Sequence, residues 1–181
     1  MENLIRLRQL MSQRSIDGLA IVPGPNLSYL TGSEFHLSER PVVLFVRQND
    51  AVFVLPELEC PKITDLDIDF ISYDDRDGPG PAFAQFSKGN KFSGLGVESR
   101  LIRHLELNLI SSYNISSDII DATDLFAELR MSKSKIEVDH MTKAVKTAER
   151  SLVSVLDKMR PGVTEKQFAT ELVIQLLHNG S

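Results

Sequence analysis

Apolar positions in the first two thirds of the chain switch between helical spacing and short runs rich in β-formers. Leu4, Leu7, Leu10 and Met11 recur every three or four residues, which predicts an amphipathic helix over 2–15. Further helices are expected over 82–88, 101–112 and 123–130, and strands over 19–22, 42–46, 51–55, 68–73, 92–97 and 119–120. Because strands and helices interleave, the pattern predicts an α/β fold.

Turn residues refine this prediction. A short polar break over 47–50 separates two strands rich in Val and Phe, which predicts a β-hairpin and therefore a mixed rather than a purely parallel sheet. Residues 23–26 end the first strand, and a single helical turn is expected to follow and to close at Gly32. The acidic stretch 74–81, with its Gly and Pro residues, predicts a loop.

From residue 124 onward the periodicity is helical throughout. Two capping boxes, Ser134 with Glu137 and Thr164 with Gln167, predict helices that begin there and run to about Arg160 and across 164–178. The last helix is apolar on more than one side, so we expect it to pack on the first domain or to pair with another copy of the chain. We therefore divide the chain into domains 1–123 and 124–181 and expect the second to be incomplete.

Composition narrows the class of protein. The 181 residues are 42% apolar and 25% charged, as in a globular domain, and the net charge is −5. Acidic and basic residues are mixed along the chain, which argues against nucleic acid as a partner. The single cysteine, Cys60, excludes an intrachain disulfide. No signal peptide and no run of about 20 apolar residues is present, so we predict a cytoplasmic protein without membrane contact.

Candidate catalytic chemistry is sparse. The four histidines lie far apart without metal-binding spacing, and there is no Gly-x-Ser-x-Gly sequence. Glu171 and His178 share a helix face but lie two turns apart, so we interpret both as solvated surface residues. We predict no catalytic residue and no metal ligand in this chain. The segment 32–40 is the best binding candidate, because it concentrates charge, an aromatic ring and an imidazole in one loop.

Several motifs, in order, resemble the creatinase/prolidase family. Each is modest alone, but together they span nearly the whole chain. They are Pro25-Asn26-Leu27-Ser28-Tyr29-Leu30-Thr31-Gly32, Glu39-Arg40-Pro41, Leu55-Pro56-Glu57-Leu58-Glu59, Gly96-Val97-Glu98, Leu129-Arg130-Met131-Ser132-Lys133-Ser134-Lys135-Ile136-Glu137 and Arg160-Pro161-Gly162-Val163-Thr164-Glu165.

This resemblance implies a specific architecture. It implies a mixed-sheet creatinase/prolidase N-terminal-type domain with flanking helices, followed by the helical start of an incomplete pita-bread catalytic domain. In full-length relatives the pita-bread domain binds two divalent metal ions of the Mn, Co or Zn class through two Asp, one His and two Glu. All five ligands are expected beyond residue 181, so the resemblance implies no cofactor in this chain and no hydrolysis by it alone.

The resemblance also implies a role. The chain is expected to be the N-terminal portion of an Xaa-Pro dipeptidase or aminopeptidase that forms a homodimer and acts on proline-containing peptides. Its loop would reach the active site of the neighbouring subunit, which makes Glu34, Phe35, His36 and Arg40 candidate substrate contacts in trans. Two alternatives remain: a non-enzymatic peptide- or histone-binding module of the same fold, and a fragment of a creatinase-type amidinohydrolase.

Overall fold

The computed structural model describes residues 2–181, which divide into two compact units between Met131 and Ser132. Helix α5 (Thr123–Met131) belongs to the first unit, because Leu125, Phe126 and Leu129 are buried in its core. The boundary expected from the sequence, between residues 123 and 124, falls instead after the first residue of this helix. Periodicity alone does not tell which neighbours an amphipathic helix will cover.

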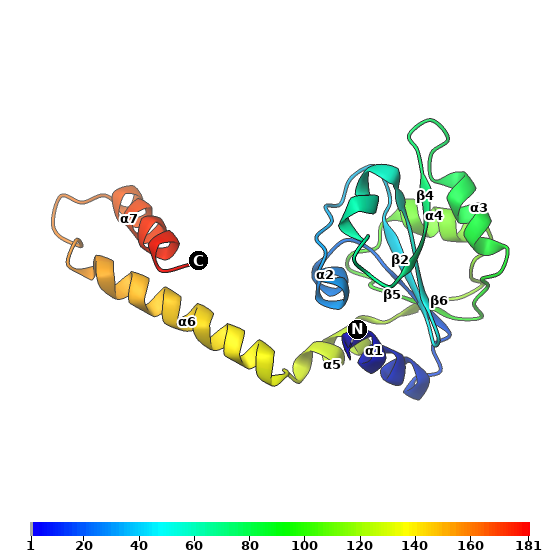
Figure 1. Ribbon diagram of the computed structural model, residues 1–181, viewed down its shortest axis with the longest axis horizontal. Coiled ribbons are helices and arrows are strands. Elements are labelled where there is room, and N and C mark those ends of the chain that lie inside the picture. Colours follow the sequence, from blue (N-terminus) through cyan, green and yellow to red (C-terminus); the bar gives the residue numbers. More distant parts are fainter. Residues whose placement is uncertain (1) are drawn as a thin grey trace. The chain divides into compact units, whose positions relative to one another are not determined.

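The first unit is built on a six-stranded mixed sheet, as predicted (Figure 1). Its spatial order is β4-β3-β2-β1-β5-β6. The β2–β3 hairpin and the β1–β2 pair are antiparallel, and the remaining neighbours are parallel. The strands are β1 (Gly18–Ile21), β2 (Val43–Arg47), β3 (Ala51–Pro56), β4 (Asp69–Tyr73), β5 (Leu95–Val97) and β6 (Ile119–Asp121).

Apolar side chains cover both faces of this sheet, because successive residues of a strand point to opposite sides. In β2, Leu44 packs with α1 (Glu2–Gln13), α2 (Pro25–Thr31) and α5 on one face. Its neighbour Phe45 packs with α3 (Gly80–Ser87) and α4 (His104–Ser112) on the other face. The unit therefore has three layers, with the sheet in the middle (Figure 1).

Several elements differ in their bounds from the sequence prediction, among them the following. Helix α2 begins at Pro25, which is preset for a first helical turn, and is longer than the single turn expected; its C-cap at Gly32, left-handed with φ 74°, is as predicted. A 3₁₀ helix, η1 (Glu57–Lys62), follows β3, where none was predicted. Strand β5 is shorter than expected, because Phe92 forms only an isolated bridge with Ser116.

The second unit is a helical hairpin of α6 (Lys135–Leu156) and α7 (Glu165–His178). Both predicted capping boxes are present at the helix starts. Val155 is the one apolar side chain among residues 132–181 that is fully buried, and Ser151 beside it is also buried. Within residues 2–181, no helix has both the length and the apolarity needed to cross a membrane.

Candidate functional site

The loop of residues 32–42 connects α2 to β2 and is fixed at both ends. Near its start, the Ser33 hydroxyl donates to the carbonyl of Lys62 at 2.8 Å. Near its end, the buried Tyr73 hydroxyl donates to the carbonyl of Pro41, also at 2.8 Å. Burial raises the pKa of Tyr73, so this phenol stays protonated and remains a donor. The loop is thus held by a backbone carbonyl of η1 and a side chain of β4 rather than by regular secondary structure of its own.

Phe35 lies inside the core beneath the loop. Its side chain is buried, and its ring centroid is 5.7 Å from that of Phe53 in β3. The Lys62 ammonium lies 5.3 Å from the same ring, within cation–π range. In this conformation the ring anchors the middle of the loop, so lining a proline pocket would require Phe35 to leave the core.

Arg40 has acidic partners within its own unit. Its Nε and Nη2 atoms donate to the two carboxylate oxygens of Asp75 at 2.6 and 2.7 Å, and Nη1 pairs with Glu39. The hydrogen bond and the charge of Asp75 raise the pKa of Arg40, and the pair lowers the pKa of Asp75. Such a bidentate pair fixes the guanidinium geometrically. A substrate carboxylate at Arg40 would therefore compete with Asp75 and Glu39 for this guanidinium.

Glu34 and His36 remain at the surface. Both side chains are exposed, and within residues 2–181 neither makes a hydrogen bond or an ion pair. The four candidate residues therefore separate into three environments: Phe35 in the core, Arg40 against Asp75, and Glu34 with His36 in solvent. The structure does not gather them into one pocket of this chain.

Sequence reasoning missed a polar support for this loop from α4. The Arg103 side chain donates to the carbonyl of Ser38 and also pairs with Glu106, which is fully buried. The Glu106 carboxylate further accepts from the Arg103 backbone N–H at 3.0 Å, which caps the helix. The three-residue spacing from Arg103 to Glu106 is a visible signal, but the contact to Ser38 spans 65 residues.

A second missed cluster joins three of the quoted motifs. Asn26 donates from Nδ2 to Oε1 of Glu98 and accepts at Oδ1 from Nη1 of Arg130 at 3.3 Å. Glu98 follows β5 and is only 5% exposed. Burial raises its pKa, while the Asn26 amide and the charge of Arg130 act in the opposite direction. We call Asn26, Glu98 and Arg130 the junction cluster.

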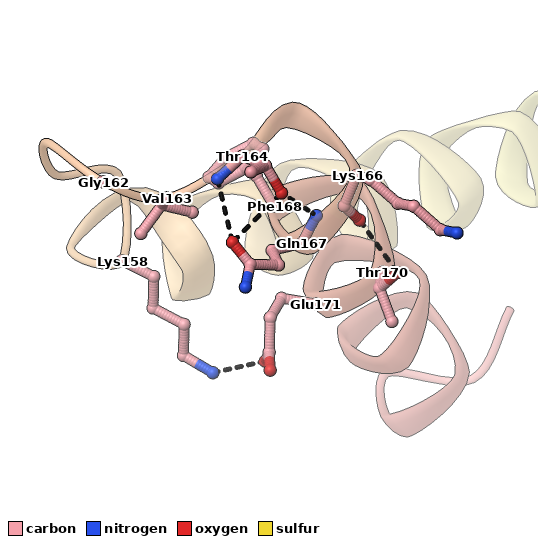
Figure 2. Close-up of a pocket in the computed structure, with 9 residues that line it drawn as sticks. All are labelled: Lys158, Gly162, Val163, Thr164, Lys166, Gln167, Phe168, Thr170 and Glu171. Carbon is pink, nitrogen blue, oxygen red and sulfur yellow. Dashed lines mark hydrogen bonds and ion pairs between the residues drawn. The ribbon is translucent and has the colours of Figure 1, made fainter.

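The second unit contains an open hollow of about 590 Å³ where α6 turns into α7 (Figure 2). Four of its polar residues already have partners: Lys158 pairs with Glu171, and Thr164 and Gln167 form the capping box at the start of α7. Glu171, interpreted as a solvated surface residue, pairs here with Lys158, and His178 is exposed and lies outside the lining. The hollow brings together no set of catalytic groups.

Metal-binding chemistry does not fit the described residues. Across residues 2–181, no three side chains of His, Cys, Asp or Glu come together as a potential ion site. A centre with two divalent ions needs several carboxylates around both ions. We therefore derive no catalytic step through a metal for these residues.

Comparison with known proteins identifies the family. The model of the creatinase/prolidase N-terminal domain matches residues 4–132. The chain belongs to this family. The chain is 28% identical to the probable dipeptidase PepE of Mycobacterium tuberculosis over 169 residues, which is 90% of this chain and 44% of PepE. It is 21% identical to the Xaa-Pro dipeptidase of Pyrococcus horikoshii over 187 residues, covering 99% of this chain and 49% of that protein.

Solved structures give the same picture of the fold. Dipeptidase PepE from Mycobacterium ulcerans matches with a TM-score of 0.84 and 27% identity, over 99% of this chain and 49% of PepE. A creatinase N-terminal domain of a dipeptidase from Streptococcus thermophilus matches with a TM-score of 0.65 and 19% identity, over 72% of this chain and 99% of that domain. The chain spans about half the length of the curated relatives it matches.

Proposed function

We propose that this chain is the N-terminal part of a dipeptidase of the Xaa-Pro type and that it does not hydrolyse peptides by itself. The observation that carries the proposal is the collinear match to dipeptidases over 90% or more of this chain and less than half of their length. On this proposal, two divalent ions of the Mn, Co or Zn class act in a region of the protein outside these residues. The chain contributes the surfaces that shape and present the substrate site.

We propose further that α6 and α7 begin the catalytic domain and that their apolar side chains pack against its remaining part. Solved structures that match the hairpin as well as the first unit are about twice the length of this chain. The Streptococcus domain, of which 99% is matched, covers only 72% of this chain. Both helices expose apolar side chains along their length, which supports packing against a further part of the protein.

We also propose a division of roles within the loop of residues 32–42 in a homodimer. Glu34 and His36 are exposed and are the candidates for contact with a peptide bound to the neighbouring subunit. A protonated imidazole can pair with the carboxylate of a dipeptide. Phe35 and Arg40 would position this loop from beneath and from the side, through Phe53 and Asp75.

The division of labour is tested by comparing two polypeptides. The 181-residue chain is assayed with a set of Xaa-Pro dipeptides in the presence of Mn²⁺, Co²⁺ or Zn²⁺, beside a longer polypeptide read from the same gene. We expect turnover from the longer polypeptide only. Turnover by the 181-residue chain would contradict the proposal, and an inactive longer polypeptide that binds peptides would favour the binding module.

The loop assignment is tested in an active longer polypeptide by His36→Ala, with His104→Ala as the matched control. His104 is another exposed histidine of the first unit, at the start of α4. Loss of a charge-assisted contact to the substrate should raise KM about tenfold with kcat nearly unchanged, whereas the control should match the wild type. Equal effects of both substitutions would refute a specific role of His36.

A further inference from the structure

The junction cluster links three elements that are distant in sequence. Asn26 lies in the first turn of α2, Glu98 directly follows β5, and Arg130 is the penultimate residue of α5. The two hydrogen bonds of the cluster span 72 and 104 residues. Arg130 is also the last residue but one of the first unit, so the cluster lies where the chain leaves that unit.

Asn26 is the central member, and both ends of its amide are used. Its Nδ2 can only donate and faces the Glu98 carboxylate, whereas its Oδ1 can only accept and faces the Arg130 guanidinium. Rotating the amide by half a turn would place donor against donor and acceptor against acceptor. The carboxylate therefore sets the orientation of Asn26, and Asn26 in turn presents an acceptor to Arg130.

Burial of the Glu98 carboxylate costs folding free energy, so a purely structural role does not explain this residue well. Its side chain is buried, and within residues 2–181 its Oε2 atom has no hydrogen-bond partner. A buried, half-satisfied carboxylate generally destabilises a fold relative to a neutral residue of the same shape. Its charge is nevertheless the feature that strengthens the bond to Asn26 and attracts Arg130.

Other contacts hold the same turn of α5. Arg6 of α1 donates from Nη2 to the carbonyl of Leu129 at 3.1 Å, and the Arg130 guanidinium lies 5.9 Å from the ring of Tyr29 in α2. Asn3 in turn donates to the carbonyl of Tyr29 at 3.1 Å. The end of α5 is thus tied to α1 and α2, and through the junction cluster to β5.

We infer that Glu98 is a positioning residue: acting through Asn26, it holds Arg130 and so fixes the segment by which the chain leaves the first unit. This role goes beyond the proposed peptidase activity and does not depend on it. It predicts that Glu98 controls the order of residues 130–134 more than it controls the stability of the core.

Hydrogen exchange of the full 181-residue chain tests the inference, with Glu98→Gln as the main variant and Glu128→Gln as the control. Glu128 lies in α5, the helix that contains Arg130, and forms an exposed ion pair with Arg14. The control therefore removes one negative charge outside the junction cluster. In Glu98→Gln, exchange of residues 130–134 should rise about fivefold, because hydrogen bonds to ionised groups are stronger than neutral ones. The melting temperature should stay equal or increase.

A second variant makes the test independent of any folding defect at the buried site. Arg130 is exposed, so Arg130→Gln should fold normally and should raise exchange of residues 130–134 as Glu98→Gln does. If both act through one chain of bonds, the double variant should show no more exchange than the larger single effect. The inference is overturned if the two effects add, if the control matches Glu98→Gln, or if Glu98→Gln lowers the melting temperature and leaves this segment unchanged.

Discussion

The two units use their apolar side chains in opposite ways. In the first, both sheet faces are covered, and strands, helices and loop all contribute side chains to two buried clusters. In the second, Val155 is the fully buried apolar side chain, and Thr147 and Ser151 of α6 bond to Asn179 at the end of α7. Its large exposed apolar side chains are Ile136, Val138, Met141, Val145, Leu152, Val153, Leu156, Met159, Val163, Val173, Ile174 and Leu177.

Well-formed helices therefore do not by themselves make a self-sufficient unit. Both helices of the hairpin have good caps, but helices gain most of their stability in proteins from packing an apolar face. The first unit contains that packing within itself. The second unit must obtain it elsewhere, which is the physical basis for proposing that it begins a larger domain.

The largest expected effect comes from the core of the first unit. Phe45 is buried, stacks on Phe86 with centroids 4.1 Å apart and meets Phe83 edge-on. Phe45→Ala should lower the free energy of unfolding by about 3–5 kcal/mol, measured by urea titration with circular dichroism. The control is Phe70→Ala, the same deletion in edge strand β4 at a side chain that is 49% exposed. A similar loss in both variants would mean that the described core does not carry the stability.

The next effect depends on pH and concerns Glu98. Its pKa in the folded state lies above the ordinary value of 4.5, so the folded chain binds this proton more tightly than the unfolded chain. The unfolding free energy of the wild type should therefore fall relative to Glu98→Gln as pH rises from 4.5, by at most about 1.4 kcal/mol per pH unit, and then level off. Urea titrations of both proteins at several pH values measure this difference in unfolding free energy. A difference that does not change with pH would contradict a raised pKa of the buried Glu98 carboxylate.

The smallest effect concerns the start of the second unit. The Ser134 hydroxyl accepts from the Glu137 backbone N–H at 3.2 Å, so Ser134→Ala removes a helix cap of about 1 kcal/mol. Because α6 lacks a packed core, amide exchange near its start should rise several-fold. Thr142→Ala is the control, since its hydroxyl donates to the Val138 carbonyl within the same helix and takes no part in the cap. Equal effects of both changes would argue against the cap.

The fold was largely predictable from the sequence because its signals are local. Alternating apolar residues and the polar break at 47–50 are enough to define the hairpin and the mixed sheet. Both capping boxes also formed as predicted, because each needs only residues three apart. The helix face that meets α7 was less predictable: Thr147 and Ser151 bond there to Asn179, whereas the apolar side chain of Leu152 stays exposed.

The candidate site was less predictable because its contacts are long-range. The loop was identified from composition, but the burial of Phe35 depends on Phe53, and the state of Arg40 depends on Asp75. In the sequence, the three residues of the junction cluster belong to three separate motifs, and nothing there indicates that they are in contact. Its three residues become one feature when the sheet brings the end of β5 beside α2 and α5.

Hydrogen exchange across the whole 181-residue chain tests the contrast between the two units most directly. Amides of β1, β2 and β3 should exchange only through global unfolding of the first unit, whereas amides of α6 and α7 should exchange orders of magnitude faster through local opening. Protection of α6 and α7 equal to that of the central strands would contradict the account, because the hairpin would then have a cover within this chain or a second copy of it.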